Sequence, residues 1–212
     1  DGTLVDTEPI HNEAERRMLL HFGVESAPDP PRQFGITPEC GMIVVADFYG
    51  LGDPQQLLEI YGPLWDRLLE ERLTTMPGVV ALFTALRGAG VPLALVTSGD
   101  REYAELVLRM VGLTDLFAFT VTGDDVSEMK PSPEPYLLAA ERLGLFPEQV
   151  VAFEDSAAGV ASVVAAGIFC IAVAADVHDR PELAAAQMHI ASLNDFGPSE
   201  IRRLFAGGPV GD

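Results

Sequence analysis

The chain has 212 residues, 48% of them hydrophobic, which is enough for one sizeable core with a smaller inserted domain. Thirteen Lys and Arg stand against 32 Asp and Glu, giving a formal net charge of −19, so we expect no nucleic acid partner. No apolar run reaches the roughly 18 residues of a membrane span. Cys40 and Cys170 lie in very different segments, so we expect no disulfide and a cytoplasmic protein.

The first third of the chain has a helical pattern. Helical spacing at 10–22 and at 55–73 predicts two helices, and the Pro- and Gly-rich stretch between them predicts a connecting loop. Pro77 and Gly78 then mark a change of pattern. We therefore expect an all-helical domain at 9–75, inserted into a core domain made of 1–8 and 76–212.

From residue 78 onward, short apolar runs alternate with helical patterns. The runs that predict buried parallel strands are 91–96, 117–122, 150–153 and 168–173. The helical patterns between them are 79–86, 103–110, 136–143 and 157–166. This alternation predicts the α/β fold class, with a Rossmann-like parallel sheet and helices on both of its faces.

Polar residues of several kinds follow these predicted strands. Thr97 and Ser98 come after 91–96, while Glu154 and Asp155 come after 150–153. Ligands of an open α/β sheet bind at the carboxyl ends of its strands, so we expect these four residues to share one edge. Carboxylate oxygens at such an edge suit Mg²⁺, although an acidic pair in a loop is more often a solvated turn.

Two further features favour an anion site. Lys130, the only lysine of the chain, precedes Pro131, which restrains the backbone around it; a surface lysine before a helix is the simpler interpretation. Thr97, Ser98 and Gly99 offer hydroxyls and backbone N–H groups before a predicted helix. They could equally act as an ordinary helix cap, and the two roles are compatible.

Taken together, these motifs resemble those of the haloacid dehalogenase (HAD) superfamily. The chain carries, in order, Asp1-Gly2-Thr3, Thr97-Ser98, Lys130-Pro131 and Glu154-Asp155-Ser156. The resemblance covers nearly the whole chain. The helical insert after the first motif resembles the cap of the subgroup that includes β-phosphoglucomutase and many sugar-phosphate phosphatases. It implies the HAD fold with a helical cap domain.

The resemblance also implies roles for the motif residues. The family's first motif reads Asp-x-Asp-Gly-Thr, with its first Asp as nucleophile, and the sequence opens at the second. We expect the nucleophile upstream of Asp1, because its strand would be the central one of the family's 5-4-1-2-3 sheet. Asp1 would protonate the leaving oxygen. Lys130, Thr97 and Ser98 would hold the phosphoryl group. Mg²⁺ would be bound by Asp1, Glu154 and Asp155.

Substrate recognition is expected from the cap, where the signals are weaker. Glu8 and His11 lie three residues apart at the entry to the cap, although a surface histidine is the simpler interpretation. Gly35 and Thr37 lie in a segment that resembles the subgroup's substrate loop. Pro38 stands where β-phosphoglucomutases have a phosphate-binding arginine, which argues against a mutase, although Arg32 could substitute.

The expected activity is a Mg²⁺-dependent phosphatase with a phosphoaspartate intermediate. Its substrate would be a small phosphorylated metabolite such as a sugar phosphate, a polyol phosphate or phosphoglycolate. One alternative is a β-phosphoglucomutase-like phosphomutase, and another is a non-catalytic binding protein if the nucleophile is truly missing. We expect neither nucleic acid nor membrane as a partner, and a monomer or small homo-oligomer.

Overall fold

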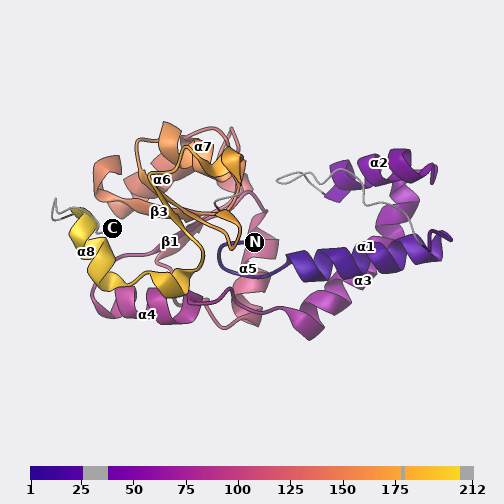
Figure 1. Cartoon of the computed structure of the whole chain (residues 1–212), viewed down its shortest axis with the longest axis horizontal. Helices are drawn as coiled ribbons and strands as arrows, with labels where there is room; N and C mark the ends of the chain where they lie inside the picture. The colour runs from indigo at the N-terminus through magenta and orange to yellow at the C-terminus, as the bar shows by residue number, and fades with distance from the viewer. Residues whose placement is uncertain (26–37, 178–179, 206–212) are drawn as a thin grey trace. The chain divides into compact units, whose positions relative to one another are not determined.

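The computed structural model describes residues 1–25, 38–177 and 180–205, which form two compact units (Figure 1). The helical unit contains Asp1 and Val5–Thr74, and the sheet unit contains Gly2–Leu4 and the chain from Thr75 onward. Each unit is described by itself. The predicted domain boundaries at residues 8 and 75 remain a prediction.

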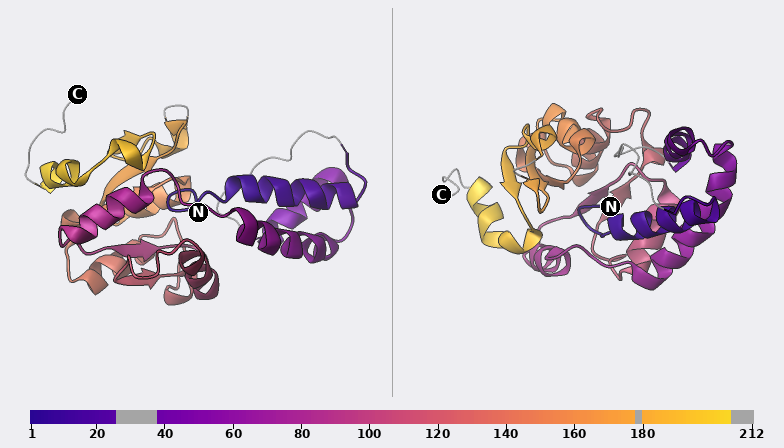
Figure 2. Two further views of the ribbon diagram at one scale, coloured as in Figure 1. Left: turned by 90° about the horizontal axis from the view of Figure 1, so that it is seen from below. Right: turned by 45° about the vertical axis from the view of Figure 1, so that its right-hand side comes forward.

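The helical unit consists of α1 (Glu8–His21), α2 (Pro38–Tyr49) and α3 (Pro54–Arg72). Helices α1 and α3 lie side by side, as both views in Figure 2 show, and α2 also packs on α3. The α1 contribution to the core repeats every four residues, with Ile10, Ala14 and Met18 all buried. Asp53 caps α3 by accepting a hydrogen bond of 3.0 Å from the Gln55 N–H.

Helix α2 corrects the sequence prediction, which placed a loop between the two other helices. Its sequence contains Gly41 and several β-branched residues, which lower the intrinsic preference for a helix. Met42, Val45 and Ala46 are nevertheless buried on one face. Burial of this apolar face against α3 outweighs the weak local preference.

In the part of the sheet unit that the structure describes, there are five short strands, all paired in parallel. Strands β1 (Ala94–Val96) and β2 (Phe119–Val121) form one pair, with Ala94 opposite Phe119. Strands β3 (Val151–Glu154), β4 (Phe169–Val173) and β5 (Met188–Ile190) form a second sheet in that order. The helices of this unit are α4 (Val79–Gly88), α5 (Arg101–Met110), α6 (Glu134–Leu143), α7 (Ala157–Ala165) and α8 (Pro198–Phe205).

The parallel α/β fold class is therefore confirmed, with differences in detail. All four predicted strands are present; three are shorter, for example Ala94–Val96 within the predicted 91–96, and β3 is shifted by one residue from the predicted 150–153. Strand β5 and helix α8 were not predicted. Strand β5 has only three half-buried residues, one of them His189, so it leaves no apolar run in the sequence.

Strand β4 is covered on both faces. Ile171 and Val173 belong to a buried cluster that also contains residues of α4, whereas Cys170 and Ala172 belong to a second cluster built around α7. Successive side chains of a strand point to opposite faces, so the alternation places β4 between two helical layers. This burial explains why its sequence is continuously apolar.

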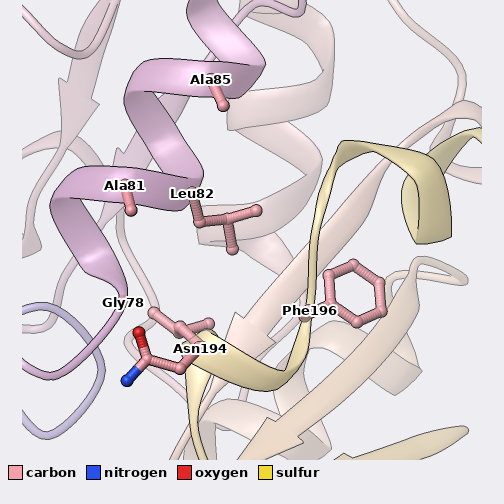
Figure 3. Close-up of a pocket in the computed structure, with 7 residues that line it drawn as sticks. Gly78, Ala81, Leu82, Ala85, Asn194 and Phe196 are labelled. Atoms are coloured by element: carbon pink, nitrogen blue, oxygen red, sulfur yellow. The ribbon is translucent and has the colours of Figure 1, made fainter.

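A small cavity of about 190 Å³ lies between α4 and the short helix η5 (Leu193–Asp195), as Figure 3 shows. It is lined by Gly78, Ala81, Leu82, Ala85, Leu193, Asn194 and Phe196. A side chain at Gly78, whose φ is +89°, would overlap the backbone of η5, so only glycine fits there. None of the predicted site residues lines this cavity, and its largely apolar wall does not suit a phosphate.

Among the described helices, none combines the length and the apolar character that crossing a bilayer demands.

Candidate active site

Lys130 points into the sheet unit. Its Nζ donates to the backbone oxygen of Val96 at 3.2 Å and to the Tyr136 hydroxyl at 3.3 Å, and it forms an ion pair with Glu154. The Lys130 side chain is only 10% exposed, and that of Glu154 only 5%. The simpler interpretation of Lys130 as a surface lysine is therefore wrong. The ammonium group lies where β1 and β3 both end.

Glu154, the last residue of β3, is satisfied by other protein groups. Its carboxylate accepts hydrogen bonds from Lys130 and Tyr136, and from Ser156 Oγ at 3.3 Å. It also lies against Gly159 in the first turns of α7, where an added Cβ would overlap it. These contacts hold the Glu154 carboxylate among protein groups, and its predicted role as a metal ligand remains a prediction.

Tyr136 is a member of this network that sequence reasoning missed. It lies on α6 and is buried, and its hydroxyl donates to Glu154. Burial, and then the adjacent Glu154 carboxylate, raise the pKa of Tyr136 well above its usual range. The hydroxyl therefore keeps its proton at neutral pH. The sequence pointed to Tyr136 only through its position, because it lies six residues after Lys130 and both residues follow the same predicted strand.

Asp155 makes different contacts from its neighbour Glu154. Its Oδ1 accepts a hydrogen bond of 2.7 Å from the Thr3 hydroxyl. Gly2, with φ +66°, lies so close that a Cβ there would overlap the Asp155 carboxylate. Burial raises the pKa of Asp155; the Thr3 hydrogen bond opposes this rise and the charge of Glu154 adds to it. The first and last motifs are thus in direct contact.

Thr97 follows β1 directly. Its N–H donates to the Val121 oxygen at 2.9 Å, which ties the loop to β2. Its hydroxyl oxygen accepts from the Gly99 N–H at 3.1 Å and keeps its own proton to donate. Ser98 is exposed beside it. Both residues therefore lie at the carboxyl end of β1, where the sequence placed them.

The start of α5 differs from the prediction. Asp100 is its N-cap and accepts from the Tyr103 N–H at 2.8 Å, while Asp124 accepts from the Arg101 N–H at 3.0 Å. Two of the first helical amides are thus bound by carboxylates, and neither Thr97 nor Ser98 is the cap. A phosphate group at this loop would rely on the Thr97 and Ser98 groups more than on the helix terminus.

The predicted cap residues lie in the helical unit or outside the described residues. Glu8 is exposed in the first turn of α1. His11 Nδ1 is 2.8 Å from the Tyr61 hydroxyl, and its Nε2 is 3.3 Å from Glu15. Gly35 and Thr37 fall outside the residues that the structure describes, so their role stays a prediction.

The predicted Mg²⁺ site requires oxygen ligands that lie close together. Across residues 1–25, 38–177 and 180–205, no group of three or more His, Cys, Asp or Glu side chains is arranged to hold a metal ion. Asp155 nevertheless offers a hard carboxylate ligand cradled by Gly2. Asp1 is exposed, immediately before that glycine, and can offer a backbone carbonyl. This donor chemistry fits part of a Mg²⁺ site.

Comparison with known proteins identifies the class of this fold and site. A family model for haloacid dehalogenase-like hydrolases matches residues 1–167, and the chain belongs to this family. The protein is thus an enzyme of the phosphoric monoester hydrolase class, in agreement with the names of its relatives.

Two relatives and one solved structure illustrate the similarity. Validoxylamine A 7′-phosphate phosphatase of Streptomyces hygroscopicus is 35% identical over 94% of this chain and 96% of its own. A phosphorylated carbohydrates phosphatase of Thermotoga maritima is 35% identical over 79% of each chain. The crystal structure of a HAD family hydrolase from Deinococcus radiodurans, with bound phosphate and sodium, aligns with a TM-score of 0.79 at 25% identity, covering 98% of this chain and 93% of its own.

Proposed function

We propose that the protein is a Mg²⁺-dependent phosphatase that hydrolyses a small phosphorylated metabolite through a phosphoaspartate intermediate. The observation that carries this proposal is the buried Lys130–Glu154 pair at the carboxyl ends of β1 and β3. A fixed cation at that edge is suited to a phosphoryl group, whose transfer depends on charge neutralisation and positioning. The Thr97 hydroxyl, on the neighbouring loop, supplies a neutral donor.

In this proposal, Lys130, Thr97 and Ser98 bind the phosphoryl oxygens. Asp1 protonates the leaving alcohol and then removes a proton from the attacking water, so that one carboxyl group serves as acid and as base. The attacking carboxylate is the aspartate expected two positions before Asp1. Glu154 holds Lys130 in place and does not contact the substrate.

Asp155 and the backbone carbonyl of Asp1 would hold Mg²⁺. Bound Mg²⁺ supplies Lewis acidity at the phosphoryl oxygens and lowers the repulsion that an anionic nucleophile meets. The donor chemistry supports this assignment, because Glu154 is paired with Lys130, whereas Asp155 accepts a hydrogen bond from the neutral Thr3 hydroxyl.

The names of two relatives support a substrate class. They refer to validoxylamine A 7′-phosphate and to phosphorylated carbohydrates. We therefore propose a phosphorylated sugar or polyol as the substrate, with phosphoglycolate as a smaller candidate. Cytoplasmic location, and a monomeric or small homo-oligomeric state, remain predictions.

Hydrolysis is favoured over the mutase alternative by the charges of the helical unit. A mutase must hold a second phosphate, and that requires cations. Arg16 and Arg17 on α1 are both engaged by Glu13, with N–O distances of 2.8 and 2.7 Å. Arg16 and Arg17 are thus each held in an ion pair on α1, and Pro38 stands where a mutase would have its phosphate-binding arginine. Both observations favour hydrolysis over the mutase reaction.

The test is phosphate release from a panel of sugar and polyol phosphates by the full-length protein, with Mg²⁺ and with a chelator. We expect release that requires Mg²⁺ and falls at least about a hundredfold in Lys130→Ala, since removing a preorganised cation costs several kcal/mol of transition-state stabilisation. Arg109→Ala, on an exposed face of α5, is the control. Glucose 1- and 6-phosphate interconversion faster than phosphate release would establish the mutase alternative instead.

A further inference from the structure

One contact spans almost the whole sequence. The Thr3 hydroxyl donates to Asp155 Oδ1 at 2.7 Å, which links the first motif to the residue after β3, 152 positions away. Thr3 therefore touches the carboxylate that is proposed to bind the metal through its side chain.

The Asp155 carboxylate is confined by two neighbours. Thr3 holds Oδ1, and the Gly2 backbone lies against the carboxylate so closely that no Cβ would fit. Rotation of the carboxylate plane would break the first contact or tighten the second. Thr3 thus engages Oδ1, while Oδ2 is the carboxylate oxygen that lies nearest to Gly2.

The charges of the two neighbouring acids are balanced differently. Glu154 faces the ammonium group of Lys130, so its charge is compensated inside the protein. The Thr3 hydroxyl orients Asp155 but contributes no positive charge, and burial and the charge of Glu154 raise the pKa of Asp155 more than the charge of Lys130 lowers it. A divalent cation bound at Asp155 would compensate this carboxylate directly. A lysine or arginine in the place of Thr3 would compete with it.

We propose that Thr3 is a positioning residue that sets the Mg²⁺ affinity of the enzyme by fixing the Asp155 carboxylate. The inference rests on the proposed Mg²⁺-dependent function. Hydrogen bonds to metal-binding carboxylates preorganise them, and losing such a partner weakens metal affinity by about 10- to 100-fold in known sites.

The experiment measures Mg²⁺ binding itself by isothermal titration calorimetry on the full-length protein, without substrate. Thr3→Val keeps the shape of the side chain and removes the hydroxyl, and we expect the Mg²⁺ dissociation constant to rise about tenfold. Thr3→Ser restores a hydroxyl and should bind within about threefold of the wild type. Thr84→Val, on an exposed position of α4, controls for a distant threonine substitution.

The outcomes separate this inference from the function on which it rests. If the wild type binds Mg²⁺ and Thr3→Val binds it equally well, the positioning role is wrong and the proposed function stands. If the wild type neither binds Mg²⁺ nor requires it for phosphate release, both fail. The unfolding temperature of each variant, measured in the presence of a chelator, shows whether Thr3→Val has a folding defect. If it does, the Mg²⁺ affinity of Thr3→Ser becomes the test. A tenfold loss of affinity in Thr3→Ser, which keeps the hydroxyl, would overturn the role of the hydroxyl.

Discussion

Lys130 and Glu154 form a buried ion pair that joins the loop after β2 to the end of β3. Each group needs the other, because a single charge in this environment would be desolvated without compensation.

Breaking the ion pair should destabilise the fold strongly. We expect Glu154→Ala to lower the free energy of unfolding by about 3–5 kcal/mol, because Lys130 then remains buried without its counter-ion. Urea denaturation of the wild type and the variant measures this change. Glu141→Ala, at an exposed position of α6, is the control. In the double variant with Lys130→Met, the loss should be smaller than the sum of the two single losses; additive losses would argue against coupling.

The raised pKa of Tyr136 predicts a pH dependence in the alkaline range. The folded state holds the phenolic proton more tightly than the unfolded state, so the corresponding stability is complete below about pH 10. It is lost progressively as the pH rises above that value. Tyr136→Phe cannot ionise, so its stability should fall less steeply between about pH 9 and 11. Chemical denaturation at several pH values measures both slopes, and equal slopes would contradict the prediction.

Asp125 predicts the opposite pH dependence in the acid range. Hydrogen bonding from the Thr122 N–H, with further contributions from Thr122 Oγ1, Arg142 and Arg101, lowers the pKa of Asp125 to about 2. Its contribution to stability is present above about pH 4 and lost as the pH falls toward 2. We expect Asp125→Asn to cost about 1–2 kcal/mol at pH 7 and almost nothing near pH 2.

The matched control for Asp125 is Asp66→Asn, an exposed carboxylate in the helical unit. Urea denaturation of both variants at pH 7, 4 and 2.5 follows the difference from the wild type. A cost of Asp125→Asn that stays constant across this range would show that the carboxylate charge does not contribute to the fold.

We expect position 159 to need a glycine because the Glu154 carboxylate lies against it, and not because helix α7 favours glycine there. Alanine favours a helix over glycine by about 1 kcal/mol, so Gly62→Ala, where a Cβ meets open space in α3, should stabilise the protein. Gly159→Ala should destabilise it, because the new Cβ would overlap the Glu154 carboxylate. Phosphate release should also fall, since Lys130 loses its fixed partner. A stabilising Gly159→Ala would show that Glu154 moves aside at little cost.

The sequence alone was sufficient for the family, the α/β class and the order of the motif residues. Periodicity and glycine positions are local signals, and parallel strands bring their carboxyl ends to one edge, so Thr97, Ser98, Glu154 and Asp155 could be placed there. The α2 prediction failed because its helix depends on burial against α3, which no local pattern records. Strand β5 is too short to leave a pattern.

Only the tertiary structure showed which contacts each of the two neighbouring acids makes. From the sequence, Glu154 and Asp155 are equivalent acids. In the fold, Glu154 contacts Lys130 and Tyr136, whereas Asp155 contacts Thr3, 152 residues away. Adjacent side chains at a strand end point in different directions, and their partners come from segments that only folding brings together. Long-range contacts therefore determine which carboxylate is paired with Lys130 and which accepts the Thr3 hydroxyl.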